Sequence, residues 1–155
     1  MTSPKQVGEQ AAAFTAKDQF GQEQTLTGLI SEKALLLVFY PFAFSGICTG
    51  ELCSIRDDLS RFANDKVQVV GISCDPMFTQ RAWADDQGYD FPLLSDFWPH
   101  GSIAKDYGVF NEDAGMAIRG TFLIDGSATI TWSQVNGPGE ARDFAGYDEA
   151  VAKLS

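Results

Sequence analysis

An almost continuous apolar run, Ala34 to Tyr40, is the feature that most constrains the fold of this chain. Apolar side chains follow one another without the polar alternation of a half-exposed strand, and Pro41 ends the run. Such runs are typical of a strand whose sheet is covered on both faces. Parallel strands of this kind are joined by crossover connections, most often helices. The run therefore predicts an α/β protein with helices on both faces of its sheet.

The segments around this run alternate as such a sheet requires. Apolar positions at helical spacing predict a helix from Gly46 to about Asn64, and Val67–Ile72 predicts a second buried strand. The other expected elements are a hairpin with a glycine turn within Phe14–Leu26, a helix at Thr79–Gln87 ended by Gly88, a strand at Phe91–Leu94, a helical turn or two at Ile103–Tyr107, strands at Thr121–Ile124 and Thr129–Val135 joined by a hairpin turn, and a helix from about Ala141 to Leu154. This order predicts one domain, residues 1–155, with a thioredoxin-like fold: a mixed central sheet flanked by helices and preceded by an extra N-terminal hairpin.

Composition excludes several functional classes. The chain has 155 residues, of which 45% are hydrophobic and 21% charged, as in ordinary globular proteins. A net charge of -10 argues against nucleic-acid partners and against anionic membrane surfaces. The longest apolar run, Ala34–Phe44, is well short of the roughly 20 residues that a membrane-spanning helix needs. The polar N-terminus lacks the apolar segment of an export signal, so we expect a cytoplasmic protein without membrane contact.

The cysteines do not form a recognisable metal site. The chain contains Cys48, Cys53 and Cys74 but no Cys-X-X-Cys pair, and its only histidine is His100. In a reducing compartment the three thiols are expected to be mostly reduced. The sequence thus raises the question of which thiol, if any, is reactive.

Cys48 stands where reactivity is physically favoured. The first buried strand passes to the long helix through Pro41, and Ser45 is a good N-cap residue for that helix. Cys48 would then be the third helical residue, where the helix dipole and a nearby hydroxyl favour thiolate over thiol. A thiolate attacks peroxides to give a sulfenic acid, and Pro41 would shield the sulfur. The competing interpretation is a small inert core thiol beside a serine that only caps a helix.

The spacing of Pro41, Ser45 and Cys48 resembles the Pro-X-X-X-Ser/Thr-X-X-Cys active-site motif of the peroxiredoxins. The similarity extends along almost the whole chain, through Phe39–Pro41, Phe91–Asp96, Tyr107–Val109 and Arg119–Asp125. The segment Phe97–Gly101 is especially similar to actinobacterial peroxiredoxins of the alkyl hydroperoxide reductase E type. The resemblance implies a thiol peroxidase with the fold expected above.

Roles for the matching residues follow from the resemblance. Ser45 would hydrogen-bond the peroxide and the Cys48 sulfur, and Arg119 would stabilise the thiolate and polarise the O–O bond. Arg119 as a surface ion-pair residue is the competing interpretation. Glu51 would order hydrogen bonds near Arg119. Phe42 and Phe44 flank the motif and could line an apolar rim that admits alkyl hydroperoxides, or could simply pack in the core.

Cys53 raises the question of how a Cys48 sulfenic acid is resolved. The same five-residue spacing occurs in the bacterioferritin-comigratory (Q-type) peroxiredoxins, where the second cysteine forms an intrachain disulfide with the first, whereas the E type commonly lacks it. In an intact helix the two Cα atoms would lie roughly 8–9 Å apart, and a disulfide needs less than about 7 Å, so the first turn would have to unwind near Gly50. Otherwise Cys53 is a packing thiol and an external thiol resolves Cys48; approach by Cys74 is a less favoured option.

The resemblance also implies partners. The expected substrates are hydrogen peroxide and organic hydroperoxides, and the expected reductant is thioredoxin, a mycoredoxin or a low-molecular-weight thiol. A homodimer is expected, with no cofactor and no metal. Two rival functions remain: a thioredoxin-like disulfide reductase, which the absence of Cys-X-X-Cys disfavours, and a non-catalytic thioredoxin-fold binding protein, in which Cys48 would not consume peroxide.

Overall fold

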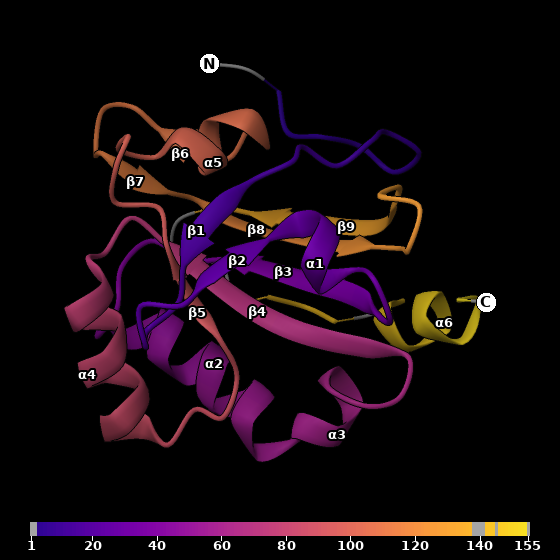
Figure 1. The fold of residues 1–155 in the computed structure, drawn as a ribbon, viewed down its shortest axis with the longest axis horizontal. Coiled ribbons are helices and arrows are strands. Elements are labelled where there is room, and N and C mark those ends of the chain that lie inside the picture. The colour runs from indigo at the N-terminus through magenta and orange to yellow at the C-terminus, as the bar shows by residue number, and fades with distance from the viewer. Residues whose placement is uncertain (1–2, 138–141, 145, 155) are drawn as a thin grey trace.

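The computed structural model describes residues 3–137, 142–144 and 146–154, with the side chains of residues 47–50 outside that description. A seven-stranded mixed sheet forms its centre, in the order β2-β1-β5-β4-β3-β8-β9 (Figure 1). Its strands are β1 (Thr15–Lys17), β2 (Glu23–Thr25), β3 (Ala34–Phe39), β4 (Val67–Ser73), β5 (Leu93–Ser95), β8 (Arg119–Ile124) and β9 (Ile130–Asn136). The expected thioredoxin-like α/β fold with an N-terminal hairpin is therefore confirmed.

Strand β3 is the middle of this sheet, as its apolar run predicts. All six of its residues are buried. It pairs in parallel with β4 on one side and antiparallel with β8 on the other. Because β8 runs antiparallel, its first residue, Arg119, lies beside the end of β3, where the chain leaves the sheet for Pro41. The topology thus brings two segments far apart in sequence to one edge of the sheet.

Helices cover both faces of the sheet. The helices are α1 (Leu26–Leu29), α2 (Gly46–Asp57), α3 (Leu59–Phe62), α4 (Met77–Gln87), α5 (Ser102–Asp106) and α6 (Tyr147–Ala152). Buried residues of α2, α3, α4 and α6 form one apolar cluster, and those of α1 and α5 belong to a second cluster. In Figure 1, α2, α3 and α4 lie below the sheet, while α5 and the short β6–β7 hairpin (Phe110–Asn111 and Met116–Ala117) lie above it.

The helix that was expected from Gly46 to about Asn64 is interrupted. Asp58 has φ -126° and ψ 44°, which ends α2 at Asp57 and starts the separate short helix α3. Aspartate is a poor residue for a helix interior. After the break Phe62 is buried and stacks on Tyr147, with ring centroids 5.2 Å apart. Helical spacing alone could not predict this turn toward a distant segment.

The expected C-terminal helix from Ala141 is also wrong in its first part, as far as the described residues extend. Arg142 to Phe144 is not helical, and α6 starts only at Tyr147, after Gly146 with φ 82°. The reason is tertiary, because the Arg142 side chain is buried among acceptors from β3, α2 and β8. The other boundaries agree with expectation within a few residues, including Gly88 in the left-handed conformation after α4.

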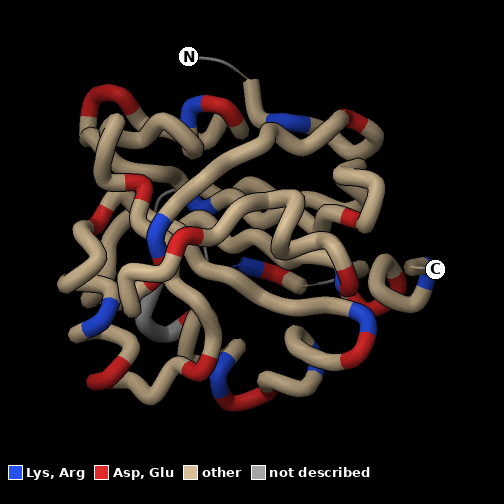
Figure 2. The backbone as a smooth tube through the Cα atoms, viewed as in Figure 1, with Lys and Arg blue, Asp and Glu red and all other residues tan. Residues whose placement is uncertain are grey.

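The acidic character of the sequence is spread over the surface. Figure 2 shows acidic positions in many loops and helix ends around the molecule rather than in one patch. Within the described part of the chain, no helix has both the length and the apolar character needed to cross a bilayer.

Candidate active site

The loop between β3 and α2 has a compact, unusual conformation. Ser45 is the N-cap residue of α2, as the sequence predicts, but its side chain makes no capping hydrogen bond. Its hydroxyl instead donates to the carbonyl of Phe42 at 2.8 Å. Phe44 has φ 68°, a left-handed conformation that is uncommon for a bulky residue. The expected side-chain cap is therefore wrong, and the hydroxyl closes the loop on itself.

A buried carboxylate holds this loop against the sheet. Asp75 lies just beyond β4 and accepts a hydrogen bond from the backbone N–H of Ala43 at 2.7 Å. The same oxygen accepts from the hydroxyl of Ser73 at 2.5 Å, and Ser73 accepts from Gln80 of α4 at 2.8 Å. Gln80 in turn accepts from the hydroxyl of Tyr40. Sequence reasoning missed this chain of contacts, because its members are scattered over three elements.

Position 48 lies in the first turn of α2. With Ser45 as N-cap and Gly46 as the first helical residue, Cys48 is the third helical residue, as expected. The Cys48 side chain is among those outside the described residues, so its contacts are not part of this structure. Its backbone position places it at the N-terminus of a 12-residue helix, where a negative charge is favoured.

One turn further along α2, Glu51 meets Arg119. The Glu51 carboxylate forms an ion pair with the Arg119 guanidinium, and their side chains are only 8% and 6% exposed. Arg119 is the first residue of β8 and is thus brought to the end of β3 by the antiparallel pairing. The interpretation of Arg119 as a surface ion-pair residue is contradicted by this burial. The structure brings together two residues, Glu51 and Arg119, that the sequence assigned to one site.

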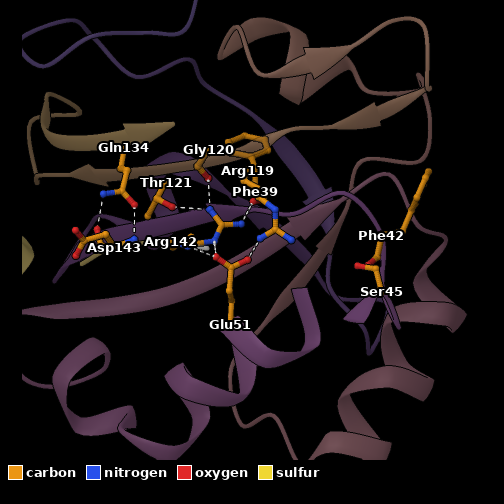
Figure 3. Close-up of polar contacts among 10 residues, drawn as sticks. All are labelled: Phe39, Phe42, Ser45, Glu51, Arg119, Gly120, Thr121, Gln134, Arg142 and Asp143. Carbon is orange, nitrogen blue, oxygen red and sulfur yellow. Dashed lines mark hydrogen bonds and ion pairs between the residues drawn. The ribbon is translucent and has the colours of Figure 1, made fainter. Parts of the chain in front are cut away.

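A second arginine, Arg142, completes the cluster and was not predicted. Its backbone N–H donates to Glu51 Oε2 at 2.6 Å, and its Nε lies 3.4 Å from the same oxygen. Its terminal nitrogens donate to Thr121 Oγ1 at 2.6 Å, to Gly120 O at 3.2 Å and to Phe39 O (Figure 3). The available signal was that Arg142 is the single basic residue between Arg119 and Lys153.

These three side chains bring two guanidinium groups and one carboxylate together at the end of β3. Because all three side chains are withdrawn from solvent, their field is weakly screened. Such a cluster stabilises an anion nearby. A thiolate is the anion that the preceding turn of α2 could supply.

The aromatic residues of the loop face solvent. Phe42 is 37% exposed and Phe44 is 54% exposed, although the Phe44 ring lies 6.3 Å from that of Trp83. Both can contribute to an apolar rim, and neither is a core residue. Pro41 is half-buried at the start of the loop.

Cys53 points away from this cluster and is not poised for a disulfide. It is half-buried, and its sulfur lies 3.3 Å from Gln87 Oε1 and 3.4 Å from the hydroxyl of Tyr89. Helix α2 continues from Gly46 through Asp57. A Cys48–Cys53 bond would therefore require both the loss of these polar contacts and the unwinding of the first turns of α2.

Cys74 is in an unreactive setting. It is 2% exposed, and burial, followed by the nearby charge of Asp96, raises the pKa of its thiol to about 12. A thiol with such a pKa is almost entirely protonated at neutral pH and is a poor nucleophile. Among the described residues, no group of three or more His, Cys, Asp or Glu side chains is arranged to hold a metal ion.

Comparison with known proteins agrees with this picture. The AhpC/TSA family matches residues 7–133. Alkyl hydroperoxide reductase E of Mycobacterium tuberculosis is 49% identical over 149 residues, covering 96% of this chain and 97% of that protein. The crystal structure of peroxidoxin BcpB from M. tuberculosis superposes with a TM-score of 0.82, at 34% identity and 94% coverage of both chains. That of the reduced 2-Cys peroxiredoxin of Plasmodium vivax gives a TM-score of 0.83 at 29% identity, covering 96% of this chain and 81% of the other. With its thioredoxin-like sheet and the arginine–glutamate cluster beside the first turn of α2, this chain belongs to the AhpC/TSA family and is an enzyme of the peroxiredoxin type.

Proposed function

We propose that Cys48 is the nucleophile with which this chain carries out thiol-dependent peroxide reduction. The observation that supports this role best is the buried pair of Glu51 and Arg119, one helical turn beyond position 48. The Cys48 thiolate attacks one peroxide oxygen, an S–O bond forms and the O–O bond breaks. The other oxygen leaves with the electron pair and takes up a proton to give water or an alcohol. Cys48 is thereby oxidised to a sulfenic acid.

Three neighbouring residues have supporting roles in this proposal. Arg119 stabilises the thiolate and the charge that develops on the departing oxygen, since a guanidinium is permanently charged and offers forked donors. Ser45, whose hydroxyl donates to the carbonyl of Phe42 in this structure, hydrogen-bonds the peroxide. Pro41 limits access of water to the sulfur. The exposed rings of Phe42 and Phe44 supply apolar surface for organic hydroperoxides as well as hydrogen peroxide.

Stopped-flow oxidation of the reduced protein tests the assignment of the nucleophile. We expect hydrogen peroxide to be consumed with one equivalent per Cys48, and Cys48→Ser to abolish consumption. Cys74→Ser is the matched control and should retain the full rate, because Cys74 is buried and protonated. Undiminished consumption by Cys48→Ser would contradict the role of Cys48. A wild-type protein that consumes no peroxide would favour a non-catalytic thioredoxin-fold binding protein.

We further propose that Cys53 resolves the sulfenic acid. Its thiolate would attack the Cys48 sulfur, so that the S–S bond forms, the S–O bond breaks, and the departing hydroxide takes up a proton to give water. Helix α2 is intact in this structure, so the step requires local unwinding near Gly50, and glycine lowers the cost by roughly 1 kcal/mol relative to alanine. Oxidation with one equivalent of peroxide, followed by peptide mass mapping, should give a Cys48–Cys53 disulfide. A lasting Cys48 sulfenic acid beside an unmodified Cys53 would instead indicate a one-cysteine enzyme resolved by an external thiol.

The reductant proposed for the oxidised enzyme is thioredoxin, a mycoredoxin or a low-molecular-weight thiol. All three act by thiol–disulfide exchange or by direct attack on the sulfenic acid. Turnover measured with each in turn, at matched thiol concentration, identifies the one that supports catalysis. The same reducing chemistry is available in the cytoplasm, which is the proposed location.

A homodimer formed near the active-site loop is also proposed. Besides Phe42 and Phe44, the exposed aromatic residues of the described chain include Phe78 of α4 and Trp98, which are 74% and 82% exposed. The Asp75 contact with Ala43 places the loop beside the start of α4. Aromatic residues are enriched in protein interfaces. Sedimentation equilibrium of the wild type and of Trp98→Glu should give a dimer and a weakened dimer, respectively; a monomeric wild type would contradict the proposal.

A further inference from the structure

A cross-strand pair of side chains on β8 and β9 binds two consecutive residues, Arg142 and Asp143, by hydrogen bonds. Thr121 and Gln134 are opposite each other in the antiparallel register, so their side chains lie on the same face of the sheet. Thr121 accepts a hydrogen bond from the Arg142 guanidinium at 2.6 Å. Gln134 binds the next residue, Asp143, through the backbone. Figure 3 shows the two contacts side by side.

The contact of Gln134 with Asp143 has two points. Gln134 Oε1 accepts from the Asp143 backbone N–H at 2.8 Å, and Gln134 Nε2 donates to the Asp143 carbonyl oxygen. A carboxamide carries one acceptor and one donor group in a fixed plane, so it reproduces the pairing that a neighbouring strand would give. Asp143 lies outside any helix or strand, and this side chain supplies hydrogen bonds that a ladder supplies elsewhere.

The two hydrogen bonds of Gln134 fix the backbone on the C-terminal side of Arg142, and the hydrogen bond to Glu51 fixes the backbone on its N-terminal side. Glu51 Oε2 accepts from the Arg142 N–H at 2.6 Å, and Gln134 Oε1 accepts from the following N–H, that of Asp143. The two peptide groups that flank the Arg142 Cα atom are therefore both held. Holding both sets the φ and ψ of Arg142, and with them the direction in which its side chain leaves the backbone. That direction leads to Thr121 and Phe39, beside Glu51.

We propose that Gln134 is a positioning residue for peroxide reduction, acting through Arg142 on the contact between Glu51 and Arg119. The inference rests on the proposed function of the Arg119 cluster. Gln134 itself is on the outer strand β9, next to the strand that carries Arg119, and it does not contact Glu51 in any described interaction. Gln134 therefore acts on Arg142 through the Asp143 backbone to which it is hydrogen-bonded.

A double-mutant cycle in the 155-residue chain separates this role from general support of the fold. The measured quantity is the second-order rate constant for oxidation of the reduced protein by hydrogen peroxide. Gln134→Ala removes both hydrogen bonds and should lower the rate constant by about tenfold, the factor that corresponds to roughly 1.4 kcal/mol. In an Arg142→Met background, the same substitution should change the rate constant by less than about twofold, since the residue through which Gln134 acts is gone.

Two further variants make the test specific. Val135→Ala alters the next residue of β9, whose side chain is 40% exposed and points to the other face, and it should leave the rate constant within about twofold of wild type. Gln134→Glu keeps the acceptor for the Asp143 N–H but places an oxygen against the Asp143 carbonyl. Its rate relative to wild type should rise as pH falls from 7 to 5, because a protonated carboxyl group regains the donor.

The outcomes distinguish failure of this inference from failure of the proposed function. If Glu51→Gln and Arg142→Met both retain the wild-type rate constant, the cluster does not serve peroxide reduction, and its proposed supporting role falls together with the positioning role of Gln134, while Cys48 as the nucleophile is judged separately by Cys48→Ser. If those two variants lose activity while Gln134→Ala does not, the positioning role alone is overturned. Equal losses from Gln134→Ala in the wild-type and Arg142→Met backgrounds would also overturn it, because a purely structural effect is additive. Unfolding midpoints measured in urea for the wild type and for every variant named above establish that each is folded under assay conditions.

Discussion

The carboxylate of Glu51 contacts the guanidinium of Arg119 in a place where neither side chain is more than 8% exposed. Isolating two charges from water is costly unless each is compensated. Here the cost is offset by a third group, since the backbone N–H and Nε of Arg142 lie against the second oxygen of Glu51. The arrangement holds the Arg119 guanidinium one helical turn from position 48 of α2, where it would stabilise the proposed Cys48 thiolate.

The first prediction concerns removal of the Glu51 charge. Glu51→Gln leaves two buried guanidinium groups without their shared counterion and should destabilise the protein by about 3 kcal/mol or more. It should also slow peroxide oxidation, because Arg119 is no longer held in place. Urea unfolding and stopped-flow oxidation provide the two measurements.

Glu149→Gln is the matched control for that substitution. Glu149 pairs with Lys153 at 3.7 Å, and both side chains are about three-quarters exposed. Its loss should change the stability by less than about 0.5 kcal/mol and leave oxidation unaffected. Equal effects of the two substitutions would contradict the importance assigned to burial of the Glu51 pair.

A second prediction follows from the contact of Asp75 with the active-site loop. Asp75→Ala deprives the Ala43 N–H and the Ser73 hydroxyl of their acceptor, and each buried orphan costs about 1–3 kcal/mol. The loop should lose its defined geometry, so peroxide oxidation should slow more than alkylation of Cys48 by iodoacetamide, which does not depend on peroxide placement. Asp57→Ala, at an exposed position of α2, should affect neither rate. Equal slowing of both reactions in Asp75→Ala would argue against a loop-specific role.

A third prediction concerns the pH dependence of stability. Burial raises the pKa of Asp96 from 3.8 to about 6, although the backbone N–H groups of Ile103 and Ala104 donate to its carboxylate. Between pH 4 and pH 6 the folded state therefore holds a proton that the unfolded state has released. Stability contributed by this group is greatest below pH 4 and falls as pH rises to 6, by on the order of 2–3 kcal/mol.

Asp96→Asn provides the comparison for that titration. Asparagine does not ionise and still offers one acceptor to the start of α5. The difference in unfolding free energy between wild type and variant, measured in urea at several values of pH, should change by the amount given above across the window and level off outside it. A difference that stays constant from pH 4 to pH 7 would contradict the raised pKa.

The fourth prediction separates the three cysteines by reactivity. Because burial raises the pKa of Cys74 to about 12, iodoacetamide at pH 8 should leave Cys74 unmodified in the native protein and modify it in urea. Cys53, which is half-buried, should react more slowly than Cys48 and faster than Cys74. Peptide-resolved mass spectrometry measures all three sites in one experiment, and rapid labelling of native Cys74 would show that its environment is misassigned.

Much of the fold was predictable from the sequence, because many of its elements are determined by residues close together in the chain. The apolar run of β3, the hairpin turn at Gly21 and the left-handed Gly88 after α4 depend on interactions within a few residues. Elements whose limits depend on distant partners were predicted less well. Helix α2 stops at Asp57 and α6 starts at Tyr147, since Phe62 and Arg142 must turn toward other segments.

The features of the candidate site likewise fall into two groups, those set by local sequence and those set by distant partners. The sequence by itself determined the positions of Cys48 and Ser45 at the start of a helix, because a strand, a proline and a cap residue are local signals. Only the tertiary structure decided that Arg119 meets Glu51, that Arg142 joins them and that Asp75 holds Ala43. These residues are separated by tens of positions, and their contacts depend on the antiparallel pairing of β3 with β8 and on a segment that the sequence assigned to a helix. Local chemistry thus fixes where the proposed nucleophile lies, whereas the electrostatic field around it arises from long-range packing.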